Sequence, residues 1–191
     1  MRLHRADLVK TIIIVLSSHF NIIDCARIKE LKAEKAATCI TANTDKYIIQ
    51  FPGPLNYTAD GNRIHFFGNF TVTETIKEPL EVAVIANRCS VEMKTCEPFN
   101  KLTLSRVCTY INDENGIFIS FFKSITPVFR CPIKPGLYTF QKSVLDLTFF
   151  TIFALEGYRW QANIKLFSRD NAKRELYCLA TQALMRWVRR T

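Results

Sequence analysis

Apolar and polar positions alternate over much of the chain, which is the pattern of half-buried β-strands. The clearest case is the segment 158–167, in which every second residue is apolar or aromatic and the residues between them are polar. The segment 63–75 alternates as well, and four of its apolar residues are predicted to share one face: Ile64, Phe66, Phe70 and Val72. Asn69 and Thr71 fall on the other face, which we expect to meet water.

Other apolar runs, bounded by turn residues, predict four further strands, at 45–51, 80–87, 137–147 and 175–188. Helical spacing of Phe99, Leu102, Val107 and Ile111 predicts one short helix within 98–111. The segment 27–38 is charged and rich in alanine, which predicts a short helix or a loose tail. Short strands with regular turns indicate a mainly β protein, a β-cup or open β-sandwich, in one domain.

Residues 1–26 have the pattern of a secretory signal peptide, with basic residues before the apolar run 11–23 and cleavage near Cys25. An uncleaved anchor or a buried helix would also be apolar here, but polar residues interrupt this run. We therefore expect a secreted protein with a leader at 1–26, a tail at 27–38 and one β domain at 39–191.

The 191-residue chain carries a formal net charge of +9, which is compatible with nucleic acid, an acidic membrane surface or acidic glycans as partners. Secretion excludes nucleic acid. Most basic residues are scattered, and the one cluster, Arg186, Arg189 and Arg190 around Trp187, is either a solvated tail or a site of transient contact with anionic lipid or glycan.

Six cysteines remain if Cys25 leaves with the leader, which predicts three disulfides with 15 conceivable pairings. These cysteines are Cys39, Cys89, Cys96, Cys108, Cys131 and Cys178. The short spacing of Cys89 and Cys96 fits a hairpin closed by its own disulfide. Two sequons, at Asn56 and Asn69, predict N-glycosylation and agree with secretion.

His65 is the one histidine outside the expected leader and lies in a strand-like run, so a surface position fits it better than a catalytic one. The sequence has no Gly-rich phosphate loop and no closely spaced Cys/His pairs for a metal. We expect neither an enzyme nor a cofactor.

Between two predicted strands, the segment 148–155 carries three phenylalanines where polar turn residues are usual. Such a segment is either an exposed apolar patch of the kind that marks a binding site, or a buried strand end. The other phenylalanines of the aromatic surplus, which include Phe118, Phe121 and Phe129, fit a core at least as well as a ligand cavity.

The run Cys131-Pro-Ile-Lys-Pro-Gly-Leu-Tyr138 resembles a motif of the ganglioside-activator family of lipid carriers. The resemblance continues through Gly157-Tyr158-Arg159 to Cys178 and covers mainly the stretch 131–180. When the leader and the chain length are also considered, the chain resembles the insect chemosensory CheB proteins more closely still. The activator has a fourth disulfide, which this chain lacks.

This resemblance implies a β-cup with a deep apolar cavity and disulfides Cys39–Cys178, Cys89–Cys96 and Cys108–Cys131. It implies that the segment 148–155 lies at the cavity mouth. The residues expected to bind the ligand are Phe118, Phe121, Phe129, Phe149, Phe150, Ile152, Phe153 and Trp160. The expected function is a secreted, lipid-recognition-like carrier of a lipid, glycolipid or hydrocarbon pheromone in chemosensory perception. The alternative is an interaction module for a membrane receptor or ion channel, without a lipid cavity.

Overall fold

The computed structural model describes residues 27–40, 46–170 and 173–189, so the expected leader and Cys25 lie outside the described residues. The chain divides into two compact units. One is Met1–Ile28 with Val188–Thr191, of which only the ends of two strands are described. The other, Lys29–Trp187, contains the sheets and helices together with their contacts.

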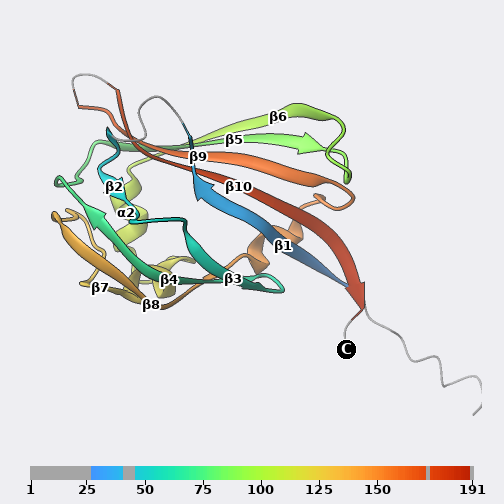
Figure 1. Cartoon of the computed structure of the whole chain (residues 1–191), viewed down its shortest axis with the longest axis horizontal. Coiled ribbons are helices and arrows are strands. Elements are labelled where there is room, and N and C mark those ends of the chain that lie inside the picture. Colours follow the sequence, from blue (N-terminus) through green and yellow to red (C-terminus); the bar gives the residue numbers. More distant parts are fainter. Residues whose placement is uncertain (1–26, 41–45, 171–172, 190–191) are drawn as a thin grey trace, which may run out of the picture. The chain divides into compact units, whose positions relative to one another are not determined.

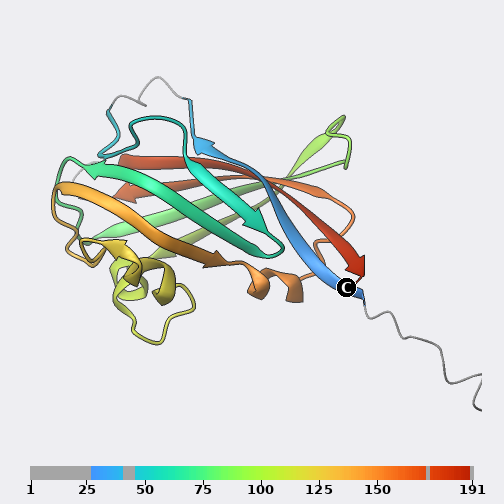
Figure 2. The ribbon, with the colours of Figure 1, turned by 60° about the horizontal axis from the view of Figure 1, so that its bottom comes forward.

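Two antiparallel sheets form two layers (Figures 1 and 2). The first sheet has the order β1-β10-β9-β5-β6, and the second has the order β2-β4-β8-β7 with β3 paired to β4. The strands of the first sheet are β1 (Arg27–Thr38), β5 (Leu80–Cys89), β6 (Cys96–Ser105), β9 (Arg159–Ser168) and β10 (Arg174–Arg189). Those of the second are β2 (Ile49–Gln50), β3 (Asn56–Asp60), β4 (Arg63–Val72), β7 (Ile125–Thr126) and β8 (Gly136–Asp146). The prediction of a mainly β, open sandwich is confirmed.

Two short helices, α2 (Val107–Asn112) and α3 (Ile119–Lys123), lie beside β7 and β8 at one end of the sheets (Figure 2). A 3₁₀ helix, η2 (Thr148–Ile152), follows β8 and leads to β9. The sequence predicted only the helix that corresponds to α2, and α3 was not predicted.

The hydrophobic core fills the space between the sheets near the helices. It joins residues of β4, β5, β8 and β10 with residues of the helices and loops, and its buried members include Phe70, Val72, Leu80, Val107, Ile111, Tyr138 and Leu176. Phe70 is central, because its ring contacts those of Phe51, Phe129, Tyr138 and Phe140. The predicted face of β4 is confirmed, since Ile64, Phe66, Phe70 and Val72 are all buried.

Three disulfides join Cys39 to Cys178, Cys89 to Cys96 and Cys108 to Cys131, which are the pairings that the resemblance implies. The second closes the β5–β6 hairpin on itself, and the third ties α2 to the loop before β8.

The prediction of a helix or loose tail at 27–38 is wrong, because this segment is the edge strand β1. Its charged residues are accommodated by ion pairs: Glu30 binds Arg186, and Glu34 binds Arg159. Leu31 of the same strand is buried. The backbone amide of Leu31 donates a hydrogen bond to the side-chain oxygen of Asn62 at 2.6 Å.

The predicted helix over 98–111 is wrong for its first part, which is strand β6, and right for 107–111, which lies in α2. The cause is an irregularity in the register between β5 and β6, where Phe99 is an extra residue between Pro98 and Asn100. Such a bulge shifts the alternation by one position, so Phe99 and Leu102 fall on one face at a spacing that imitates a helix.

The first predicted strand is also shorter than expected, since only Ile49–Gln50 pairs with β4.

Candidate functional site

The segment between β8 and β9 presents apolar side chains to solvent. Ile152 is 70% exposed, and Phe149 and Phe153 are about half exposed. Phe149 lies at the centre of an aromatic cluster, with ring centroids 5.9 Å from Phe150 and 5.6 Å from Phe153. Of the two alternatives for this segment, an exposed patch and a buried strand end, the structure shows the exposed patch.

Polar contacts hold this aromatic segment in place at both ends. At its start, the amide of Leu147 donates to the carbonyl of Asn62 at 2.8 Å, next to the β3–β4 turn. At its end, the ammonium of Lys29 donates to the carbonyl of Phe153 at 3.2 Å and lies 3.1 Å from the carboxylate of Glu156. The pKa of Glu156 is lowered by its own backbone amide and then by Lys29. The segment therefore spans from the second sheet to β1.

Trp160 of β9 lies next to the aromatic segment, since its indole nitrogen donates to the carbonyl of Leu155 at 2.7 Å. Its ring is 4.8 Å from Phe99 of β6, and Tyr158 is 6.2 Å away. The register places Leu102 and Leu104 farther along β6, on the face that Val84 and Val82 share. These five residues form an apolar strip: Phe99, Leu102, Leu104, Tyr158 and Trp160. Leu102 is 63% exposed.

The inner face of the first sheet is the face that carries Leu166 and Val82, which pack on the core. Val84, Ile164 and Leu179 lie on the same face, two residues farther along their strands from the Val82–Leu166 pair and so closer to Trp160. All three are only half-buried, and none belongs to the core. A half-covered inner face therefore runs from the apolar strip to the core.

The residues predicted to bind a ligand do not form one site. Phe149, Phe150, Ile152, Phe153 and Trp160 lie together at the end of the sheets where β8 ends and β9 begins. Phe121 and Phe129 instead pack against the core, where Phe121 contacts Phe66 and Phe140. Phe118 caps α3 at its N-terminus and is half-buried.

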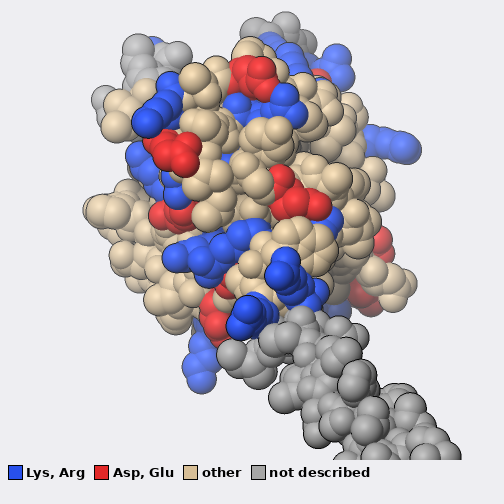
Figure 3. Space-filling model, turned by 90° about the vertical axis from the view of Figure 1, so that its right-hand side faces the viewer, with Lys and Arg blue, Asp and Glu red and all other residues tan. Residues whose placement is uncertain are grey.

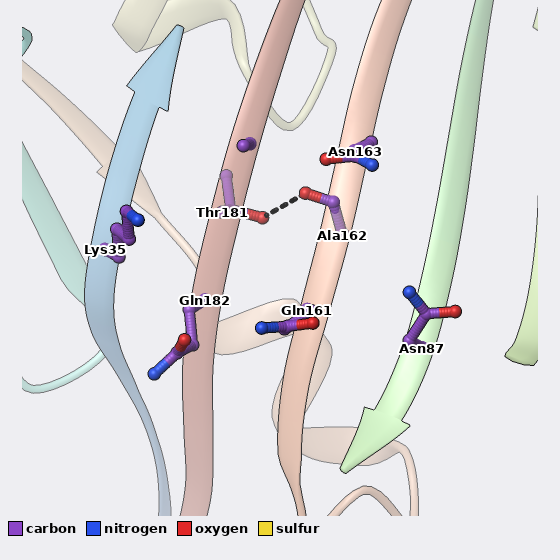
Figure 4. Close-up of a pocket in the computed structure, with 8 residues that line it drawn as sticks. Lys35, Asn87, Gln161, Ala162, Asn163, Thr181 and Gln182 are labelled. Atoms are coloured by element: carbon purple, nitrogen blue, oxygen red, sulfur yellow. Dashed lines mark hydrogen bonds between the residues drawn. The ribbon is translucent and has the colours of Figure 1, made fainter. Parts of the chain in front are cut away.

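Two hollows stand out among the described residues, and neither is the deep apolar cavity that the resemblance implies. One, of about 50 Å³, lies beside α2 and α3 and includes Phe122 and Phe129 in its lining. The other, of about 170 Å³, is lined mainly by polar side chains of the first sheet (Figure 4).

The sequons and His65 share the outer face of the second sheet. Asn56 pairs with Phe67 of β4, Thr58 pairs with His65, and Asn69 lies two positions beyond Phe67. Both asparagines are exposed, which is what glycan attachment requires. His65 is half-buried in mid-strand. Within the described ranges, no group of His, Cys, Asp and Glu could hold a metal ion.

Charges of both signs lie side by side on the face that Figure 3 shows, so the net charge of +9 does not form one cationic patch there. Ion pairs explain much of this mixing. One of them joins Arg159 of β9 to Glu34 of β1 at 2.6 Å, and the Arg159 hydrogen bond lowers the pKa of Glu34.

Sequence reasoning missed the apolar strip on β6. Phe99 and Leu102 of this strip were assigned to a helix, and the bulge in β6 explains why both lie on the same face of the strand. The tight Cys89–Cys96 spacing, which predicts a hairpin, was the available hint that a strand follows Cys96.

Fold and site together define a class: a disulfide-linked, open antiparallel β-sandwich with an exposed apolar, aromatic patch at one end. Neither the protein-family models nor the curated proteins include a match to this chain. Among the described helices, none has the length and apolar character to cross a membrane.

Proposed function

We propose that this protein is a secreted carrier of an apolar ligand, which enters between the sheets at the aromatic segment. The observation that carries the proposal is the half-covered inner face of Val84, Ile164 and Leu179, which continues the exposed apolar strip toward the core. An acyl or hydrocarbon chain laid along it would cover these side chains and itself leave water. Each buried methylene would contribute about 0.8 kcal/mol.

Secretion rests on three disulfides, on the leader pattern of residues 1–26 and on two exposed sequons. The resemblance to the chemosensory CheB and ganglioside-activator proteins extends the proposal to a fatty acid, glycolipid or hydrocarbon pheromone as ligand. Binding of this kind needs no catalytic group. The exposed Ile152 and Phe149 also suit transient contact with a membrane surface.

The test is a titration with a fluorescent fatty acid, combined with native mass spectrometry of protein secreted from eukaryotic cells. Ile152→Asp at the opening has a matched control in Ile117→Asp, because Ile117 is similarly exposed, at 64%, next to α3. We expect co-purified lipid in the wild type, about tenfold weaker binding for Ile152→Asp and unchanged binding for Ile117→Asp. A wild type that stays empty and takes up no fatty acid contradicts the proposal.

A second candidate function is an interaction module that acts on a membrane receptor or ion channel. It is favoured by the aromatic core, which fills the space near the helices with the rings of Phe70, Phe129, Tyr138 and Phe140. The aromatic segment would then contact a protein. In this case Ile152→Asp would weaken binding to receptor-bearing cells, while the wild type would bind no fatty acid.

A further inference from the structure

A polar hollow lies on the outer face of the first sheet (Figure 4). Leu166 of β9 packs on the core. Gln161 and Asn163 are an odd number of residues away from Leu166 in the same strand, so their side chains point to the opposite face of the sheet. The register places Gln182 of β10 and Asn87 of β5 directly beside Gln161. The sheet itself separates this hollow from the half-covered inner face, so a ligand could bind in the hollow whether or not the inner face carries a lipid.

Four carboxamides gather in this hollow: Asn87, Gln161, Asn163 and Gln182. Each carries N–H donors and a carbonyl acceptor, so together they can both donate to and accept from a ligand. Gln182 uses one N–H on the carboxylate of Glu34, at 3.0 Å. In the part of the chain that the structure describes, the side chains of Asn87 and Gln161 have no hydrogen-bond partner.

Rigid contacts flank the hollow on both sides. The Cys39–Cys178 disulfide lies beside Asn163, whose carboxamide oxygen is 3.9 Å from the sulfur of Cys39. On the other side, Arg159 forms an ion pair with Glu34, and this positions the Glu34 carboxylate to accept a hydrogen bond from the side chain of Gln182. Because strands and cross-links set these positions, little ordering would be needed when a ligand binds.

The lining selects the chemistry of the ligand. Lys35 is its one charged residue, and the backbone amides of paired strands are used in the sheet, so an anion such as phosphate would find a single positive charge and would leave the carboxamide oxygens unpaired. An apolar ligand would leave the carboxamides unpaired. A hydroxyl group donates and accepts as a carboxamide does, and Ala180 supplies a small apolar floor for C–H groups.

We propose that this outer-face hollow binds a neutral, hydroxyl-rich ring, such as a terminal sugar of a glycan. Its volume of about 170 Å³ lies below the range of roughly 300–1,000 Å³ for sites of drug-sized ligands. It therefore suits one sugar ring rather than an oligosaccharide. A Kd of about 1 mM is expected for a single ring held by a few hydrogen bonds.

The first experiment uses the intact secreted protein, enzymatically freed of its own N-glycans, and follows backbone amide signals by NMR during titration. The probes are methyl glycosides of glucose, galactose, mannose and N-acetylglucosamine, with inorganic phosphate as the anionic comparison. We expect one glycoside to shift the amides of 161–163, 180–182 and 86–88 with saturation. Shifts confined to other residues, stronger binding of phosphate, or no saturable shift with any glycoside would overturn the proposal.

The second experiment compares variants. Gln161→Ala and Asn87→Ala each remove an unpaired carboxamide, and Thr103→Ala, on the outer face of β6 outside the hollow, is the matched control. We expect about tenfold weaker glycoside binding for each hollow variant and unchanged binding for the control. Equal affinity in all three proteins would overturn the proposal. Fatty-acid uptake should be unaffected in every variant, so failure of the sugar site is distinguishable from failure of the proposed function.

Discussion

At the end of the sandwich where β8 begins, aromatic rings pack on one another, and Phe70 and Tyr138 are only 3% exposed. At the end where β8 finishes, rings of the same kind face solvent: Phe99 is 51% exposed and Phe149 is 48% exposed. Both ends are rich in aromatic residues. They differ in cover, because residues of α2 and α3 pack against the core at the first end, whereas Phe149 and Ile152 of η2 stay exposed at the second. Aromatic content alone therefore does not distinguish a core from an exposed patch.

The largest expected effect tests the packed end. Phe70→Ala removes a ring that contacts four others, so it should lower the free energy of unfolding by about 3–5 kcal/mol. Phe153→Ala, at the opening, should change it by less than about 0.5 kcal/mol. Denaturant unfolding of both variants checks this. Similar losses would show that the opening is packed as tightly as the core.

The disulfides provide the next test. Replacing both Cys108 and Cys131 by Ala releases α2 from the loop before β8, and the chain-entropy model gives a loss of about 3.5 kcal/mol. The same double change at Cys89 and Cys96 opens a shorter loop and should lose about 2.5 kcal/mol. Unfolding by guanidinium under non-reducing conditions measures both. A greater loss at the Cys89–Cys96 hairpin would reverse the ranking of the two ends.

One pH effect should arise from the Glu34–Arg159 pair at the end where β8 finishes. The Arg159 hydrogen bond lowers the pKa of Glu34 from its ordinary value of 4.5. The stability from this pair is therefore complete above pH 4.5 and is lost as the pH falls through the lowered pKa of the folded state. Glu34→Gln should reduce the loss of stability as the pH falls below 4.5.

Its matched control is Glu114→Gln, since Glu114 and Arg130 form a looser and more exposed pair, at 3.9 Å. Acid unfolding curves should overlay those of the wild type for Glu114→Gln but not for Glu34→Gln. Equal pH dependence in all three proteins would contradict the role given to Glu34.

The smallest effect concerns the aromatic segment itself. Lys29→Met removes the ammonium that binds the carbonyl of Phe153 and the carboxylate of Glu156, contacts expected to contribute about 0.5–1 kcal/mol. Hydrogen exchange should become a few-fold faster at 153–157 and stay unchanged at Phe70. Lys32→Met, on an exposed lysine of the same strand, should leave both rates unaltered.

Much of the fold followed from local pattern. The strands β4, β5, β8 and β9 were predicted, at 63–75, 80–87, 137–147 and 158–167, by alternation or apolar runs, because each contributes apolar side chains to the core. The strand β1 was not, because an edge strand tolerates charges that pair with neighbours such as Arg159 and Arg186. Those partners are more than 120 residues away and leave no local trace.

The sequence by itself determined that this is a mainly β chain with seven cysteines, an aromatic surplus and a strongly apolar segment between two strands. Only the tertiary structure decided which aromatics are core and which face solvent. The exposure of Phe99 depends on a bulge against β5, and that of Phe149 depends on where β8 ends relative to β9. The outer-face hollow likewise exists only because the register aligns Asn87, Gln161 and Gln182 across three strands. Such alignments join residues distant in sequence, so no local pattern of residues can specify them.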